Sequence, residues 1–119
     1  MNSRELLQSI VSLEGALLGL ISSSTGRVKE QFVNEQEFSA VKIGLNVSML
    51  YNTALEMAQH IGLQAPDYHL IHSQGYYLLT IKINDDLLFA VLQDNVDLNM
   101  IFQSVNSFIQ SAIQEQVIV

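Results

Sequence analysis

The sequence predicts an α/β (α+β) domain with five strands, mainly antiparallel, in the order α-β-β-α-β-β-β-α. Three observations support this fold class. Apolar residues recur with a helical period near both ends and in the middle of the chain. Short apolar runs lie between these segments, two before the central helix and three after it. Glycine, asparagine and aspartate separate the runs, as expected for hairpins. We expect a single domain over residues 1–119.

The first helix and the first two strands follow from the N-terminal quarter of the chain. A short helix is expected over residues 2–12, capped by Asn2 or Ser3, with an apolar stripe of Leu6, Leu7, Ile10 and Val11. Ala16–Ile21 is apolar at nearly every position, which is typical of a strand covered on both faces. Val28–Val33 carries charged residues and is expected to be an edge strand.

The segment between these strands, "SSSTG", is compatible with a phosphate-binding loop or with a simple turn. A P-loop requires a lysine and then a serine or threonine after its second glycine, at the start of a helix. Here Arg27 and Val28 follow Gly26, and the next residues are strand-like. We therefore predict a β-hairpin turn in which Gly26 supplies a positive φ.

A long central helix is expected over Glu37–Ile61. One face should lie on the sheet: Ile43, Val47, Leu50, Ala54, Met57, Ala58 and Ile61. A second apolar stripe occupies only the N-terminal half: Phe38, Val41, Leu45 and Met49. A row of small residues lies between the two faces: Ala40, Gly44 and Ser48. Small residues allow another backbone to approach, either a loop of the same chain or a helix of a second subunit. The short connections on either side of the helix leave little of the same chain to cover the second stripe, which favours the subunit.

Three strands and a final helix follow Pro66. The strands are expected at Tyr68–Ser73, Tyr76–Ile83 and Leu87–Leu92, separated by turns at Gln74-Gly75 and Asn84-Asp85-Asp86. The final helix is expected over Asp97–Gln114. Its apolar stripe contains Leu98, Ile101, Phe102, Val105, Phe108, Ile109, Ala112 and Ile113.

Composition restricts the classes of partner. Charged residues make up only 14% of the chain and hydrophobic residues 49%, so we expect an oligomer or a partner complex that covers apolar surface. The net charge of −7 argues against nucleic acid and against an anionic membrane surface. The chain has no cysteine, no signal-peptide pattern and no run long enough for membrane insertion. We expect a cytoplasmic protein.

The residues that usually carry chemistry are not grouped. His69 and His72 are three apart on an expected strand, so their rings should point to opposite faces. No serine lies in a nucleophile elbow, and no acidic cluster has the spacing of a calcium loop. We therefore expect no enzyme and no catalytic, cofactor-binding or metal site.

At this level of description the chain resembles the roadblock/LC7 family, which includes the MglB-like and dynein light chain types. The element order covers nearly the whole chain. The segment "EGALLGLISSSTGRV" is similar to the first hairpin of that family, and "GYYLLTIKINDDLLFAVLQDNVDLNMIFQSV" to its last hairpin and the start of its last helix. Family members usually carry Asp or Asn with Gly in the first turn, where this chain has Ser-Ser-Ser-Thr-Gly.

The resemblance implies a non-enzymatic dimer in which the central helix packs antiparallel on its copy. It places this helix on one face of the sheet and the terminal helices on the other, and it pairs the strand Tyr68–Ser73 with its copy. The implied dimer residues are Phe38, Val41, Gly44, Leu45, Ser48, Met49, Tyr68, Leu70 and His72. The second subunit is the same chain or a related roadblock subunit.

The resemblance also implies binding to a Ras-like small GTPase. The exposed side of the central helix offers candidate partner-binding residues: Lys42, Asn46, Thr53, Glu56 and His60. Two alternatives remain, a scaffold or motor-complex subunit without a GTPase partner, and a small-molecule sensor domain. A sensor would need a pocket in which a few polar groups converge on an apolar lining.

Overall fold

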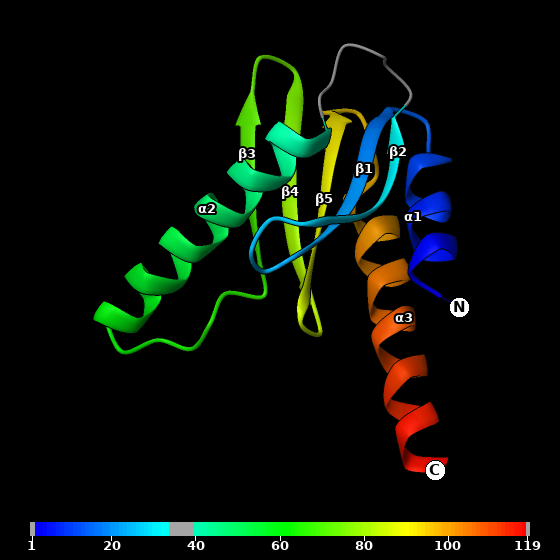
Figure 1. Cartoon of the computed structure of the whole chain (residues 1–119). Coiled ribbons are helices and arrows are strands. Elements are labelled where there is room, and N and C mark those ends of the chain that lie inside the picture. The colour runs from blue at the N-terminus through cyan, green and yellow to red at the C-terminus, as the bar shows by residue number, and fades with distance from the viewer. Residues whose placement is uncertain (1, 34–39, 119) are drawn as a thin grey trace.

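The computed structural model describes residues 2–33 and 40–118 and contains one five-stranded sheet between two helical layers (Figure 1). The strand order is β2-β1-β5-β4-β3, and every neighbouring pair is antiparallel. The helices α1 and α3 cover one face and α2 lies on the other. The predicted fold class and element order are confirmed. The elements are α1 (Ser3–Val11), β1 (Ala16–Ser23), β2 (Val28–Val33), α2 (Ala40–His60), β3 (Tyr68–Ser73), β4 (Tyr76–Ile83), β5 (Asp86–Gln93) and α3 (Leu98–Ile118).

The N-terminal elements form as their sequence predicts. Asn2 caps α1, its side-chain oxygen accepting a hydrogen bond from the Glu5 N–H at 2.8 Å. The strand β1 is buried along most of its length, because its neighbours β2 and β5 flank it and helices lie on both faces. The turn between β1 and β2 is a hairpin, closed by a 2.8 Å hydrogen bond from Ser23 N–H to Arg27 C=O, and Gly26 has a φ of 96°.

Two cores hold the layers together. The larger one lies between the sheet and α1 with α3, and includes Leu7, Leu88 and Ile101, which are fully buried. The smaller one lies under α2 and includes Leu20, Tyr51 and Phe89. The central strand β5 contributes to both cores, because alternate residues of a strand point to opposite faces. Burial of these side chains is the main driving force for folding.

The C-terminal elements differ from the prediction only at their ends. The turn between β3 and β4 has positive φ at Gln74 and Gly75, as a tight two-residue hairpin requires. Asp97 caps α3, its side chain accepting from the Asn99 N–H at 3.0 Å, so the helix begins one residue later than expected. It continues to Ile118, beyond the predicted end at Gln114, since the segment contains good helix formers and no glycine or proline.

The prediction for the sheet-facing side of α2 is partly wrong. Val47 and Ala58 are buried as expected, but Met57 is 60% exposed, Ile61 is 67% exposed, and Leu50 is also exposed. The C-terminal half of α2 extends past β3, away from the sheet (Figure 1), so Met57 and Ile61 are left largely uncovered by the described residues. The predicted start at Glu37 lies outside the described residues.

Tyr51, which the apolar pattern overlooked, is a central residue of the buried face of α2. It is only 2% exposed, and its hydroxyl donates a 2.9 Å hydrogen bond to the Pro66 C=O. A tyrosine can be buried at low cost when its hydroxyl finds such a partner. The contact also ties α2 to the segment that leads into β3.

The row of small residues on α2 makes room for the first hairpin turn of the same chain. Ser48 is buried and its hydroxyl donates a 2.6 Å hydrogen bond to the Ser24 C=O. Asn52 donates to the same carbonyl at 3.2 Å. Gly44 is buried against Gly26. A second subunit was the favoured prediction for this side of the helix; within the described structure, Gly44 and Ser48 contact their own chain.

We expect Gly44→Ala to destabilise the protein. A Cβ atom at this position would lie 2.9 Å from the Gly26 carbonyl oxygen and 2.9 Å from Val28 Cγ2. In an exposed helix the same change would stabilise by about 1 kcal/mol; here the hairpin turn must move. Urea unfolding should show a lower midpoint. A control, Gln103→Ala on exposed α3 surface, should leave the midpoint nearly unchanged. A stabilised Gly44→Ala protein would contradict the contact.

Candidate protein interaction site

The strand β3 lies at an edge of the sheet, where among the described strands it pairs only with β4. The Lys82 N–H donates to the Asp67 C=O at 2.8 Å. In an antiparallel pair the hydrogen-bonded residues alternate, so His69, Ile71 and Ser73 also direct their backbone groups toward β4. Tyr68, Leu70 and His72 direct theirs outward. This open row of donors and acceptors is a template for pairing with another strand.

The side chains of β3 divide between the two faces of the sheet. The ring of Tyr68 lies 5.0 Å from that of Phe102 in α3, measured between centroids. The ring of His69 lies 6.4 Å from that of Tyr51 in α2. The predicted dimer residues Tyr68, Leu70 and His72 therefore face the α3 side, whereas Leu45 and Met49 belong to α2. The predicted dimer residues of β3 and those of α2 therefore lie on opposite faces of the sheet, separated by the backbone of β3.

One exposed apolar row faces the β3 side; we call it the inner row, and it contains Leu50 and Met57 of α2 and Ile61, which directly follows the last residue of the helix. Leu50 lines the same cavity as His69 of β3. At 100° per residue, Met57 and Ile61 lie within about 20° of Leu50 around the helix axis. The inner row and the open edge of β3 thus border the same side of the molecule.

A second exposed region of α2, the outer arc, faces mainly away from the sheet, and at its border Asn46 also lines the cavity that contains His69. It contains Met49, which is 67% exposed, and all five candidate partner-binding residues, which are also exposed: Lys42, Asn46, Thr53, Glu56 and His60. Asn46 and Thr53 donate to carbonyls of their own helix, those of Lys42 at 3.0 Å and Met49 at 2.9 Å. The charged groups of Lys42 and Glu56 are therefore the stronger candidates for a partner.

The remaining predicted dimer residues are distributed differently. Leu45 is exposed but lies beside Gly26 of the first hairpin turn, on the side of α2 away from the inner row. Phe38 lies outside the described residues, and so does the side chain of Val41. The assignment of any of these residues to a dimer stays a prediction.

Sequence reasoning missed the inner row and the α2-facing residues of β3. Leu50, Met57 and Ile61 were assigned to the sheet because they satisfy the helical period. That period does not say where a helix leaves the sheet. For His69 and Ile71 a signal did exist, since strand alternation puts them on the face opposite to Tyr68 and Leu70.

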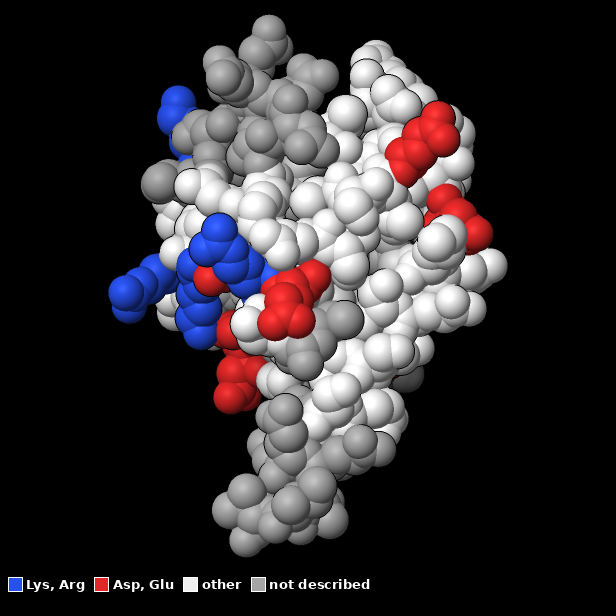
Figure 2. All heavy atoms as spheres, turned by 90° about the vertical axis from the view of Figure 1, so that its right-hand side faces the viewer, with Lys and Arg blue, Asp and Glu red and all other residues white. Residues whose placement is uncertain are grey.

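Contacts between charged side chains contribute little to the stability of this surface. Among the described residues, Lys29 and Asp86 form an ion pair at 2.8 Å, and His72 Nε2 lies 3.1 Å from Asp94 Oδ2; such solvent-accessible contacts contribute little stability. In the view toward α1 and α3, the Lys and Arg side chains gather on the left together with acidic ones, further acidic groups lie at the upper right, and most of the surface between them is uncharged (Figure 2). The described residues contain no group of three or more His, Asp or Glu side chains placed to hold a metal ion. None of the described helices has the length and apolarity needed to cross a membrane.

Comparisons with known proteins identify the fold. No family model and no curated protein matches the sequence. Among solved structures, MglB of Myxococcus xanthus superposes with a TM-score of 0.82 at 8% identity, covering 93% of this chain and 94% of that one. A roadblock/LC7 domain from Streptomyces avermitilis gives 0.79 at 13% identity, with 100% of both chains covered. A structure described as MglB with a tetrameric arrangement gives 0.77 at 14% identity, covering 92% and 87%.

The chain therefore has a roadblock/LC7-like fold, as its sequence resemblance implied. At such low identities the likeness concerns the fold. The function has to be argued from the surface of this chain.

Proposed function

We propose that this chain is a non-enzymatic, dimeric regulatory or scaffold module that binds a Ras-like small GTPase. The observation that carries the proposal is the uncovered apolar surface of α2 beside the open edge of β3. Met57 and Ile61 are more than half exposed where α2 extends past β3, and the outward backbone groups of β3 are unpaired among the described residues. Adjacent apolar side chains and a free sheet edge are what a second protein chain would cover.

The proposed dimer pairs β3 with its copy and packs the inner row of α2 against the inner row of the partner. Both features border the same side of the molecule, so one two-fold axis can serve both contacts. One of the similar MglB structures is described as tetrameric, which supports self-association at the level of this fold. In this arrangement Leu45 would lie away from the contact, unlike in the sequence-based assignment.

The outer arc would remain free in such a dimer and is the proposed GTPase-binding surface. Met49 offers an apolar anchor, and Lys42, Glu56 and His60 offer charged or titratable groups around it. Interfaces commonly combine a small apolar centre with a polar rim. In an antiparallel helix pair two outer arcs lie next to each other and would form one platform. The choice of a GTPase as the partner rests on the family resemblance and on the structural likeness to MglB.

The test is a titration of Ras-like GTPases from the same organism, in the GDP-bound and GTP-bound states, against the wild type and a Lys42→Glu, Glu56→Lys double variant. We expect binding in at least one state. The double variant keeps the net charge, so a slower association or a changed salt dependence would report the positions of the charges. If no GTPase binds, the regulatory proposal fails and a scaffold or motor-complex role without a GTPase replaces it.

A further inference from the structure

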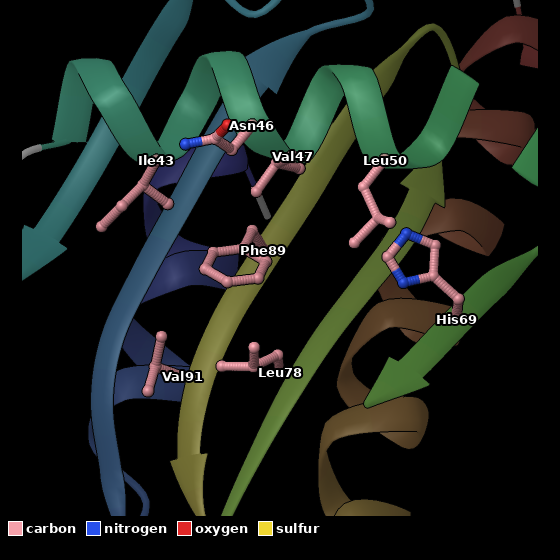
Figure 3. A pocket seen from close by; sticks show the side chains of 8 residues that line it. All are labelled: Ile43, Asn46, Val47, Leu50, His69, Leu78, Phe89 and Val91. Atoms are coloured by element: carbon pink, nitrogen blue, oxygen red, sulfur yellow. The ribbon is translucent and has the colours of Figure 1, made fainter. Parts of the chain in front are cut away.

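The cavity between α2 and the sheet has an apolar lining and a buried imidazole that take no direct part in the pairing of β3. It has a volume of about 290 Å³, at the lower end of the range typical of small-molecule sites. Its lining is almost entirely apolar, and Figure 3 shows the side chains of α2, β3, β4 and β5 that converge on it. The lining residues are Ile43, Asn46, Val47, Leu50, His69, Leu78, Phe89 and Val91.

The lining has two polar residues, Asn46, whose side-chain amide already donates to the Lys42 C=O of its own helix, and His69. Its ring extends from β3 toward Leu50 and α2 (Figure 3). Both ring nitrogens are buried, and neither has a hydrogen-bond partner among the described residues. The hydroxyl of Thr80, opposite His69 on β4 and on the same face, is also buried without a described partner. Unpaired polar atoms in a folded protein cost free energy and call for a partner.

The surroundings keep the imidazole uncharged. Burial lowers the pKa of His69 below its usual value, and the residue's own backbone opposes this to a smaller extent. His72 points to the opposite side of β3, whereas Lys82 lies on the same face as His69, with its Nζ 5.8 Å from the centroid of the Tyr51 ring that stacks on His69. A neutral imidazole presents one N–H donor and one nitrogen acceptor. A hydroxyl group can pair with either.

We propose that this cavity binds a small, neutral, mainly apolar molecule whose hydroxyl group pairs with His69. The apolar lining would supply most of the affinity, and the imidazole would select for the hydroxyl. An anionic ligand fits less well, because the chain carries a net charge of −7 and the imidazole is neutral. The ligand would contact Val47 and Leu50 on the inner side of α2, beneath the helix that carries the proposed protein contacts.

Phenol and toluene are suitable probes, because they have nearly the same shape and differ in the hydroxyl group. Each would be titrated into the intact chain while the imidazole resonances are followed by NMR. We expect the His69 signal to shift with both probes and those of His60 and His72 to stay, which makes the latter two internal references. In His69→Phe, the affinity for phenol relative to toluene should fall by about two- to tenfold. His69→Gln retains a donor and an acceptor and should recover part of this preference.

Leu78→Trp should fill the cavity and abolish binding of both probes. Three outcomes would overturn the proposal: no movement of the His69 signal with either probe, an equal loss of phenol and toluene in His69→Phe, or probe binding that disappears as the protein concentration rises. The last result would mean that a second copy of the chain fills the cavity. A circular dichroism spectrum of each variant would separate loss of the site from loss of the fold.

Discussion

A Met57→Glu protein is expected to be monomeric at concentrations where the wild type is a dimer. Met57 is 60% exposed in the inner row of α2, and its neighbours there are apolar. A carboxylate placed in this contact would be buried without a partner, at a cost of about 3 kcal/mol or more. That corresponds to roughly a hundredfold increase in the dissociation constant, and two-fold symmetry would introduce the change twice. Light scattering over a dilution series would measure it.

Two other methionines provide matched controls. Met100 on α3 is 48% exposed on the other side of the sheet, so Met100→Glu should leave the dimer intact. Met49 lies in the outer arc, so Met49→Glu should leave the dimer intact and weaken binding of the GTPase. Met57→Lys should dissociate the dimer as Met57→Glu does, which excludes simple repulsion between acidic chains. If Met49→Glu dissociates the dimer and Met57→Glu does not, the sequence-based assignment of the interface is correct and ours is wrong.

The second large effect concerns the free edge of the sheet. Leu70→Pro should abolish or strongly weaken the dimer while the monomer stays folded. The Leu70 N–H is directed outward from β3, so its loss removes no hydrogen bond between described residues, and proline is tolerated at such edge positions. On the proposed dimer the same N–H donates to the second copy. Sedimentation would follow assembly, and thermal unfolding at low concentration would follow the monomer.

Ile71→Pro is the control on the same strand. The Ile71 N–H is directed toward Leu78 of β4, so proline there removes a bond of the sheet itself and should lower the stability of the monomer. The two side chains have nearly the same exposure, 39% and 38%, so lost packing is comparable. Unchanged assembly of Leu70→Pro would show that β3 does not pair with its copy.

A feature of the site could be predicted from the sequence when a few neighbouring residues decide it. The hairpin turn at Gly26 and the cap at Asn2 were predicted correctly, because each is decided by a few neighbouring residues. The outer arc was also predicted, since exposure of Lys42 and Glu56 follows from the helical period. The inner row was not, because that period marks residues as apolar without showing what covers them.

The roles of the small residues and of His69 needed the tertiary structure. The small residues Gly44 and Ser48 indicated that another segment of backbone packs closely against α2. Only the tertiary structure shows that this segment is the first hairpin turn of the same chain. The sequence did not indicate a special environment for His69, because its unpaired nitrogens are enclosed by residues of two other elements, Leu50 and Tyr51 of α2 and Phe89 of β5.

The sequence by itself determined the order of helices and strands, the turns and the strands that are covered on both faces. These features follow from periodicity and from backbone preferences that act within a few residues. The tertiary structure decided where α2 leaves the sheet, which β3 backbone groups stay open, and which polar atoms are enclosed in a cavity. These depend on contacts between segments distant in the chain, whose geometry is set by packing of the whole core.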